Sequence, residues 1–272
     1  MQCLAKLDKR NEMKNLGTVF LVMVLLILPS SVCSEEEQEI AGRIDEIKDT
    51  VYEDYRNFYS GENLGKLAIG LGVAGVLANT SADREIQNWY QESVRNKDTD
   101  NFSRVVKTFG EGMITIPLYL GAVLLGELAK DIKLGSMTGE WGERSLRTLL
   151  VGAPPMLFLQ IALGASRPEE DDSHWRPFKD NNAVSGHGFM GAVPFIIAAK
   201  MTDNPYLRYC LYLVSTLCGL SRINDNAHYF SQAALGWWMA YLAATSVDRK
   251  REVTIAPAFI HNGIGVTVAF RF

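Results

Sequence analysis

Apolar residues gather in six stretches along this chain, each long enough for a helix and each separated from the next by polar or glycine-rich residues. The stretches are 67–78, 113–129, 146–165, 188–200, 206–220 and 231–247. None of them alternates apolar and polar residues as a half-buried strand does. The pattern therefore predicts an all-α fold, a six-helix bundle whose core spans residues 66–248.

The segment before this core has the spacing of an amphipathic helix. Apolar residues recur there at intervals of three or four, which places them on one helical face. They are Ile40, Ile44, Ile47, Val51, Tyr55 and Phe58. We therefore expect residues 34–65 to form an N-terminal helix that packs against the bundle. The more polar residues 83–109 indicate a helical hairpin that connects two parts of the core.

The pattern changes after the last apolar stretch, where the basic residues 249–251 end the helical periodicity. Apolar and other residues then alternate on both sides of Asn262-Gly263, a dipeptide typical of tight hairpin turns. Residues 249–272 are therefore expected to form a β-hairpin. Two strands cannot close a barrel, so we expect this hairpin to dock on the bundle.

The N-terminus has the pattern of a secretory signal. Basic residues precede an apolar run at 16–28, and small residues follow it at 29–34, as at a cleavage site. Residues 1–33 are therefore predicted to be a signal peptide that exports the protein to the periplasm or cell envelope. Several apolar stretches are short, glycine-rich or charged, which favours a bundle that associates with the membrane without strictly spanning it.

Composition narrows the choice of function. The chain has 272 residues and a formal net charge of −4, and it has no large basic tract. Nucleic-acid binding is therefore not expected. The length suits one helical domain of ordinary size.

Two arginines and two of the four histidines fall in three short segments. The segments are Arg167-Pro168, Ser185-Gly186-His187, and Ser221-Arg222 followed by His228. A guanidinium group grips a phosphoryl group through paired hydrogen bonds, so two arginines indicate a bound tetrahedral oxyanion. One imidazole can attack phosphorus while the other protonates the leaving oxygen. Such chemistry needs neither a metal ion nor another cofactor.

The order and spacing of these segments resemble the signature of the type 2 phosphatidic acid phosphatase superfamily, over roughly residues 110–247. That superfamily also holds class A acid phosphatases and vanadium haloperoxidases. The resemblance implies a helical bundle and a phosphorylated substrate, either a small molecule or a lipid. It implies that His228 is the nucleophile and His187 the general acid. The residues it implies for phosphate binding are Arg167, Arg222, Ser185 and Gly186.

Three positions depart from the signature. The lysine seven residues before Arg167 is Gln160, the proline before Ser185 is Val184, and the final aspartate is Gln232. Gln160 can still donate a hydrogen bond to phosphate but brings no charge. Gln232 can orient His228 but cannot stabilise its positive charge as a carboxylate does. Glucose-6-phosphatase, a working branch of the superfamily, is similar in having glutamine at this last position.

Three functions remain open from the sequence. The first is an exported phosphatase that hydrolyses phosphate monoesters or lipid phosphates and diphosphates through a phosphohistidine. The second is a catalytically weak or non-catalytic envelope protein of the same fold, which Gln160 and Val184 favour. The third is a vanadium-dependent haloperoxidase, which the missing lysine disfavours because vanadate is held by such contacts.

Overall fold

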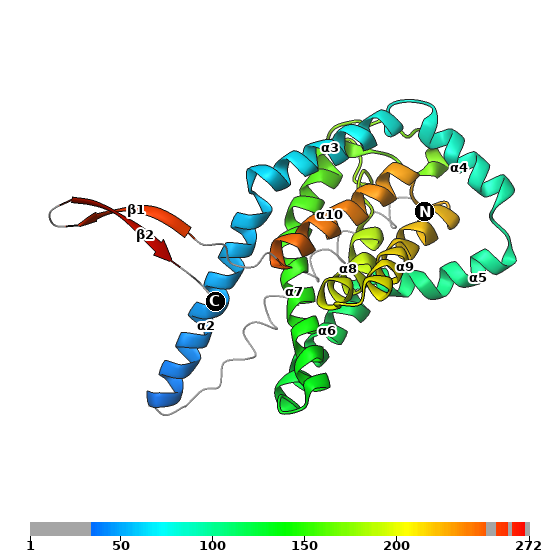
Figure 1. Ribbon diagram of the computed structural model, residues 1–272. Coiled ribbons are helices and arrows are strands. Elements are labelled where there is room, and N and C mark those ends of the chain that lie inside the picture. The colour runs from blue at the N-terminus through cyan, green and yellow to red at the C-terminus, as the bar shows by residue number, and fades with distance from the viewer. Residues whose placement is uncertain (1–33, 249–253, 261–262, 270–272) are drawn as a thin grey trace. The chain divides into compact units, whose positions relative to one another are not determined.

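A computed structural model describes residues 34–248 and the strands 254–260 and 263–269 (Figure 1). The predicted signal peptide, residues 1–33, lies outside the described residues. Contacts divide the chain into two units, Met1–Thr50 and Val51–Phe272.

Helices account for all regular structure between residues 34 and 248, so the all-α prediction is confirmed for this part of the chain. It contains the α-helices α2 (Ser34–Phe58), α3 (Gly61–Ala78), α4 (Ala82–Ser93), α5 (Lys97–Val106), α6 (Gly112–Leu128), α7 (Lys133–Leu159), α8 (Gly186–Met201), α9 (Pro205–Asn224) and α10 (Phe230–Asp248). Three short helical segments accompany them: η1 (Lys107–Gly110), the π-turn η2 (Gln160–Gly164) and η3 (Pro168–Glu170).

The six predicted helices correspond only to the apolar helices of the structure. These are α3 and α6 to α10, and the amphipathic or polar helices α2, α4 and α5 add three more within residues 34–248. The N-terminal helix also ends earlier than residue 65. Ser60 interrupts it, because the Ser60 hydroxyl accepts a hydrogen bond from the Asn63 backbone N–H at 3.4 Å and caps the start of α3.

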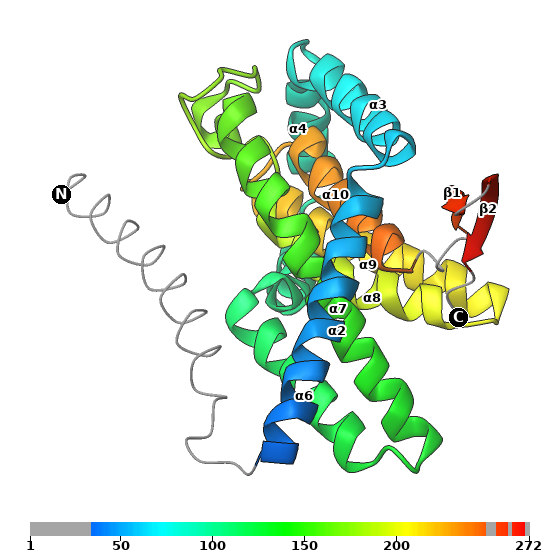
Figure 2. The ribbon, with the colours of Figure 1, turned by 90° about the vertical axis from the view of Figure 1, so that its left-hand side faces the viewer.

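The core forms around α8 and α10. Helix α10 packs against α3, α4, α7, α8 and α9 (Figure 2). Both helices are apolar on all sides, as expected of helices that other helices surround. Their largest buried side chains include Phe189, Ile196, Met239 and Leu242. The packing of α8 against α10 places His187, in the first turn of α8, close to His228, which lies just before α10.

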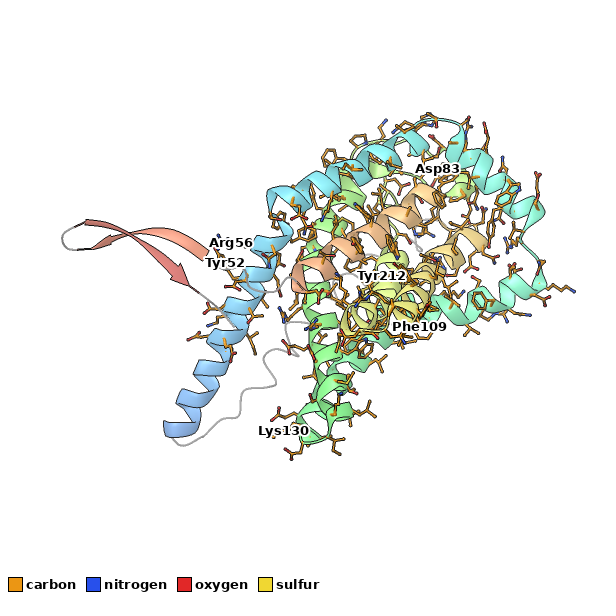
Figure 3. All side chains as sticks on the ribbon, in the orientation of Figure 1. Tyr52, Arg56, Asp83, Phe109, Lys130 and Tyr212 are labelled. Atoms are coloured by element: carbon orange, nitrogen blue, oxygen red, sulfur yellow. The ribbon has the colours of Figure 1, made fainter. Side chains whose placement is uncertain are left out.

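Asp83 of α4 fixes the start of α10 (Figure 3). The Asp83 carboxylate is fully buried and accepts hydrogen bonds from the Ser231 backbone N–H at 3.0 Å and from the Ser231 hydroxyl. A carboxylate at this end of a helix satisfies orphan N–H groups and complements the helix dipole. The contact holds the turn that carries His228.

Large apolar side chains are also exposed on the outer helices. Examples on α3, α6, α7 and α9 are Ile69, Val73, Leu124, Leu128, Phe158 and Leu213. Within the described residues, length and composition allow one helical stretch, Lys133–Glu170, to cross a membrane. Two bent helix pairs, α3 with α4 and α5–η1 with α6, raise that number to three if each counts as one span. This apolar surface supports membrane association.

The C-terminal strands β1 (Thr254–Ile260) and β2 (Gly263–Ala269) pair antiparallel. Ile260 pairs with Gly263, so Gly263 of the predicted Asn262-Gly263 turn lies in strand β2, whereas Asn262 lies outside the described residues. Docking of the hairpin on the bundle stays a prediction.

Candidate functional site

The start of α8 carries Ser185, Gly186 and His187. Ser185 is the N-cap: its hydroxyl oxygen accepts the Gly188 N–H at 3.1 Å, and its own N–H donates to the Gln232 carbonyl at 2.9 Å. Gly186 and His187 are the first two residues of the helix, where backbone N–H groups have no acceptor within the helix. Such a helix start favours a bound anion.

The turn between α9 and α10 holds Arg222 close to His228. The Arg222 carbonyl accepts hydrogen bonds from the Ala227 N–H at 2.9 Å and from the His228 N–H at 3.2 Å. Asn226 reverses the chain with a φ of 55°, a left-handed conformation that asparagine tolerates better than most residues. Its side-chain oxygen accepts a hydrogen bond from Gln87 of α4 at 2.7 Å. The loop that carries His228 is thus held at several points.

Gln232 determines which nitrogen of His228 carries the proton. The Gln232 amide nitrogen donates to the Ser166 carbonyl at 2.8 Å, and its amide oxygen accepts the Tyr229 N–H at 3.1 Å. These two partners fix the orientation of the amide from both ends. Its oxygen lies 2.9 Å from Nδ1 of His228, so Nδ1 must carry a hydrogen to donate. The other ring nitrogen, Nε2, is therefore left with a lone pair.

The environment keeps His228 neutral. Its exposed fraction is 7 %, and burial lowers its pKa to about 4. The hydrogen bond to Gln232 opposes this shift, whereas the positive charges of Arg222 and Arg167 add to it. A neutral imidazole at pH 7 can act as a nucleophile.

His187 belongs to the same electrostatic cluster. Burial is the main cause that lowers its pKa, followed by the positive charge of Arg222. Lys107 and Arg167 lower this pKa as well, and Glu111 opposes them. The structure thus brings together the four residues that were predicted to carry the chemistry: Arg167, His187, Arg222 and His228.

Each arginine is oriented by a side chain that sequence reasoning missed. Arg167 Nε donates to the Asn182 side-chain oxygen at 3.1 Å. Arg222 Nη1 lies 3.1 Å from Asp225 Oδ2. Asn182 lies outside every motif and gave no signal, whereas Asp225 stands three residues after Arg222, a spacing at which helical side chains meet.

Arg222 also has a buried donor that lacks a partner. Its Nε is inaccessible to solvent and has no hydrogen-bond acceptor among the described residues. A buried guanidinium N–H without an acceptor costs free energy, so its presence beside two neutral histidines favours an anionic ligand there.

Gln160 and Ser185 make different contacts from those predicted. Gln160 was expected to contact phosphate, but its amide nitrogen donates to the Val184 carbonyl at 2.7 Å. The Ser185 hydroxyl caps α8 and is fully buried. Gln160 and Ser185 thereby hold the loop at Val184, which brings Gly186 and His187 into place.

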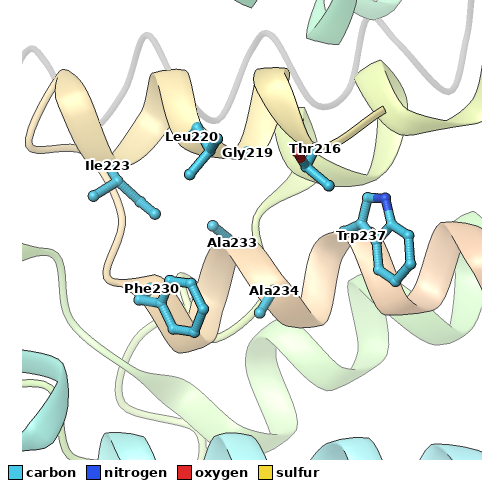
Figure 4. A pocket seen from close by; sticks show the side chains of 8 residues that line it. All are labelled: Thr216, Gly219, Leu220, Ile223, Phe230, Ala233, Ala234 and Trp237. Carbon is cyan, nitrogen blue, oxygen red and sulfur yellow. The ribbon is translucent and has the colours of Figure 1, made fainter. Parts of the chain in front are cut away.

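An apolar pocket of about 170 Å³ opens between α9 and α10 (Figure 4). It is lined by Thr216, Gly219, Leu220, Ile223, Phe230, Ala233, Ala234 and Trp237. Ile223 directly follows Arg222, and Phe230 comes two residues after His228, so the pocket borders the same turn. Within the described residues, no group of three His, Cys, Asp or Glu side chains is arranged to hold a metal ion.

Comparison with protein-family models finds a match over part of the chain. The model of the PAP2 superfamily matches residues 148–251, which include both histidines and both arginines of the site. No curated protein and no solved structure matches the chain. The match supports the resemblance of this part of the chain to the PAP2 superfamily, whose members act on phosphorylated substrates and are generally phosphatases.

Proposed function

We propose that this protein is an exported phosphatase that hydrolyses phosphate monoesters or lipid phosphates and diphosphates through a phosphohistidine at His228. The observation that carries the proposal is the contact of Gln232 with His228, because it leaves the lone pair of Nε2 free to attack. The buried Arg222 Nε beside it supports a bound phosphoryl group. Export rests on the N-terminal signal pattern.

The proposed reaction has two steps. In the first, Nε2 of His228 forms a bond to phosphorus, the bond from phosphorus to the leaving oxygen breaks, and His187 gives that oxygen a proton. In the second, His187 takes a proton from water, the water oxygen attacks phosphorus, and the phosphorus–nitrogen bond breaks to release phosphate. Arg167 and Arg222 hold the phosphoryl oxygens throughout.

Gln232 orients His228 in both steps but stabilises its positive charge less than a carboxylate would. The phosphorylated ring carries a positive charge, and an amide oxygen stabilises this charge less than a carboxylate does. An aspartate, however, has no donor for the Ser166 carbonyl, which Gln232 satisfies at 2.8 Å. Gln232 therefore orients His228 firmly and contributes less to the rate.

The pKa shifts predict an acidic optimum for kcat/KM. As the pH falls through about 4, protonation of His228 removes the lone pair that attacks. As the pH rises through the pKa of His187, which lies below 6.5, the general acid loses its proton. A bell-shaped profile with its maximum between these values is expected with a soluble phosphomonoester. His187→Asn is the control and should lack the alkaline limb, whereas a native rate that rises through pH 8 contradicts the assignment.

The function itself is tested by phosphate release from a substrate panel. The panel holds phosphatidic acid, a polyprenyl diphosphate and a soluble phosphomonoester, presented to the full-length protein in detergent. Native protein should release phosphate from at least one of them, and Gln160→Lys should do so faster because it adds charge to the site. No turnover by the native protein, with activity only in Gln160→Lys, would show a non-catalytic protein of the same fold.

A further inference from the structure

The phosphate site lacks the lysine of its superfamily signature at position 160. Gln160 stands there, and its amide nitrogen is bonded to the Val184 carbonyl. Phosphoryl transfer spreads negative charge over three oxygens, so a site with two arginines benefits from a third cation.

Segment η1 lies directly against the start of α8. A Cβ atom on Gly110 would lie 2.9 Å from the His187 Cβ and 2.8 Å from the Cys218 Sγ, so only glycine allows this approach. The Cys218 thiol in turn donates to the His187 carbonyl at 3.2 Å. Phe109, labelled in Figure 3, packs edge-on against Phe195 with ring centroids 5.5 Å apart. These contacts fix η1, and therefore Lys107 at its beginning, beside the site.

Lys107 and Arg222 share one carboxylate oxygen. Lys107 Nζ lies 3.5 Å from Asp225 Oδ2, and Arg222 Nη1 lies 3.1 Å from the same atom. The two cationic nitrogens are therefore near enough for one phosphoryl group to contact both. The Ser103 hydroxyl donates to the other oxygen, Asp225 Oδ1, at 2.6 Å and holds the carboxylate in place.

The charges around Asp225 do not balance. Asp225 faces two cations, so its single negative charge does not neutralise both of them. The side chain of Lys107 is 35 % exposed, and an ion pair at that exposure contributes little free energy. Lys107 can therefore turn from Asp225 to a bound phosphoryl group at small cost. Its effect on the pKa of His187 agrees with this position.

We propose that Lys107 binds the phosphoryl group of the substrate and supplies the charge that Gln160 lacks. It reaches the site from η1, a part of the chain outside the matched residues 148–251. Asp225 is then a positioning residue that holds Lys107 and Arg222 in reach of the same ligand. The inference rests on the proposed phosphatase function and adds a phosphate-binding residue to it.

Binding of inorganic phosphate to the full-length protein tests this proposal separately from catalysis. Lys107→Gln should raise the Kd for phosphate about tenfold, since one charge-assisted hydrogen bond is lost. Lys107→Arg should stay within about threefold of native, and Gln160→Lys should restore affinity in the Lys107→Gln background. The matched control is Lys130→Gln, which removes the same charge from an exposed pair with Glu127 (Figure 3) and should leave the Kd unchanged.

The outcomes separate the two proposals. Equal phosphate affinity of native protein and Lys107→Gln, or no phosphate binding by native protein, overturns the role of Lys107. Phosphate binding that depends on Lys107 without turnover of any substrate supports that role and contradicts the phosphatase. Unchanged thermal unfolding of Lys107→Gln is expected, because the lost ion pair is partly exposed.

Discussion

Replacing His228 by alanine is expected to lower phosphate release by at least about a thousandfold while substrate affinity changes little. The imidazole of His228 forms the bond to phosphorus, and the orientation that Gln232 gives its ring is not available to another side chain described at the site. Arg167 and Arg222 remain to bind the substrate. Steady-state phosphate release measures kcat, and equilibrium binding of inorganic phosphate reports affinity.

The matched control is His174→Ala. His174 is exposed, and its ring nitrogen Nδ1 lies 2.9 Å from Asp172 Oδ1 on the loop after η3. The control removes an imidazole without touching the cluster of Arg222, His187 and His228, so its rate should equal the native rate. If His228→Ala keeps more than about a tenth of native kcat, His228 is not the nucleophile.

Replacing Arg147 by methionine is expected to lower the free energy of unfolding by about 3–5 kcal/mol. Arg147 Nε lies 2.7 Å from Asp54 Oδ2, and Arg147 Nη2 lies 2.8 Å from Asp54 Oδ1. This bidentate ion pair links the end of α2 to α7. Asp54 is only 3 % exposed, so the substitution leaves a buried carboxylate without its counter-charge. Denaturant unfolding of the full-length protein measures the loss.

Two further variants show whether the unpaired carboxylate of Asp54 causes the loss of unfolding free energy in Arg147→Met. Asp54→Asn in the Arg147→Met background removes the stranded carboxylate and should recover part of the lost free energy. Lys48→Met breaks the exposed pair with Asp45 and should cost less than about 1 kcal/mol. A loss for Arg147→Met no larger than for Lys48→Met contradicts the importance of the Asp54 pair.

The helices and the central residues of the site follow from local sequence patterns. Apolar stretches predict α3 and α6 to α10 because helix periodicity repeats over a few residues. The spacing of three short segments identified the arginines and histidines, which the structure brings into one cluster. The break between α2 and α3 was missed by the prediction of one helix over residues 34–65, although Ser60 is a residue type that commonly starts a helix.

The supporting contacts could not be predicted, because they join segments far apart in the chain. Nothing in the sequence around Lys107 shows that it meets Asp225. Gln160 and Gln232 illustrate the same limit. From the sequence, each glutamine only replaces a charged residue of the signature. In the structure, Gln160 holds the loop at Val184 by a hydrogen bond, and Gln232 determines which ring nitrogen of His228 carries the proton. The roles of Gln160 and Gln232 depend on their hydrogen-bond partners, which cannot be read from the sequence.

Direct detection of a phosphorylated His228 tests the central claim. Native protein is mixed with a labelled substrate, quenched in alkali because phosphohistidine is labile in acid, and digested for peptide mapping. Label on the peptide with His228 is expected, because the phosphoryl group is bonded to this side chain between the two steps. Phosphate release at the native rate with no label on this peptide would contradict the claim.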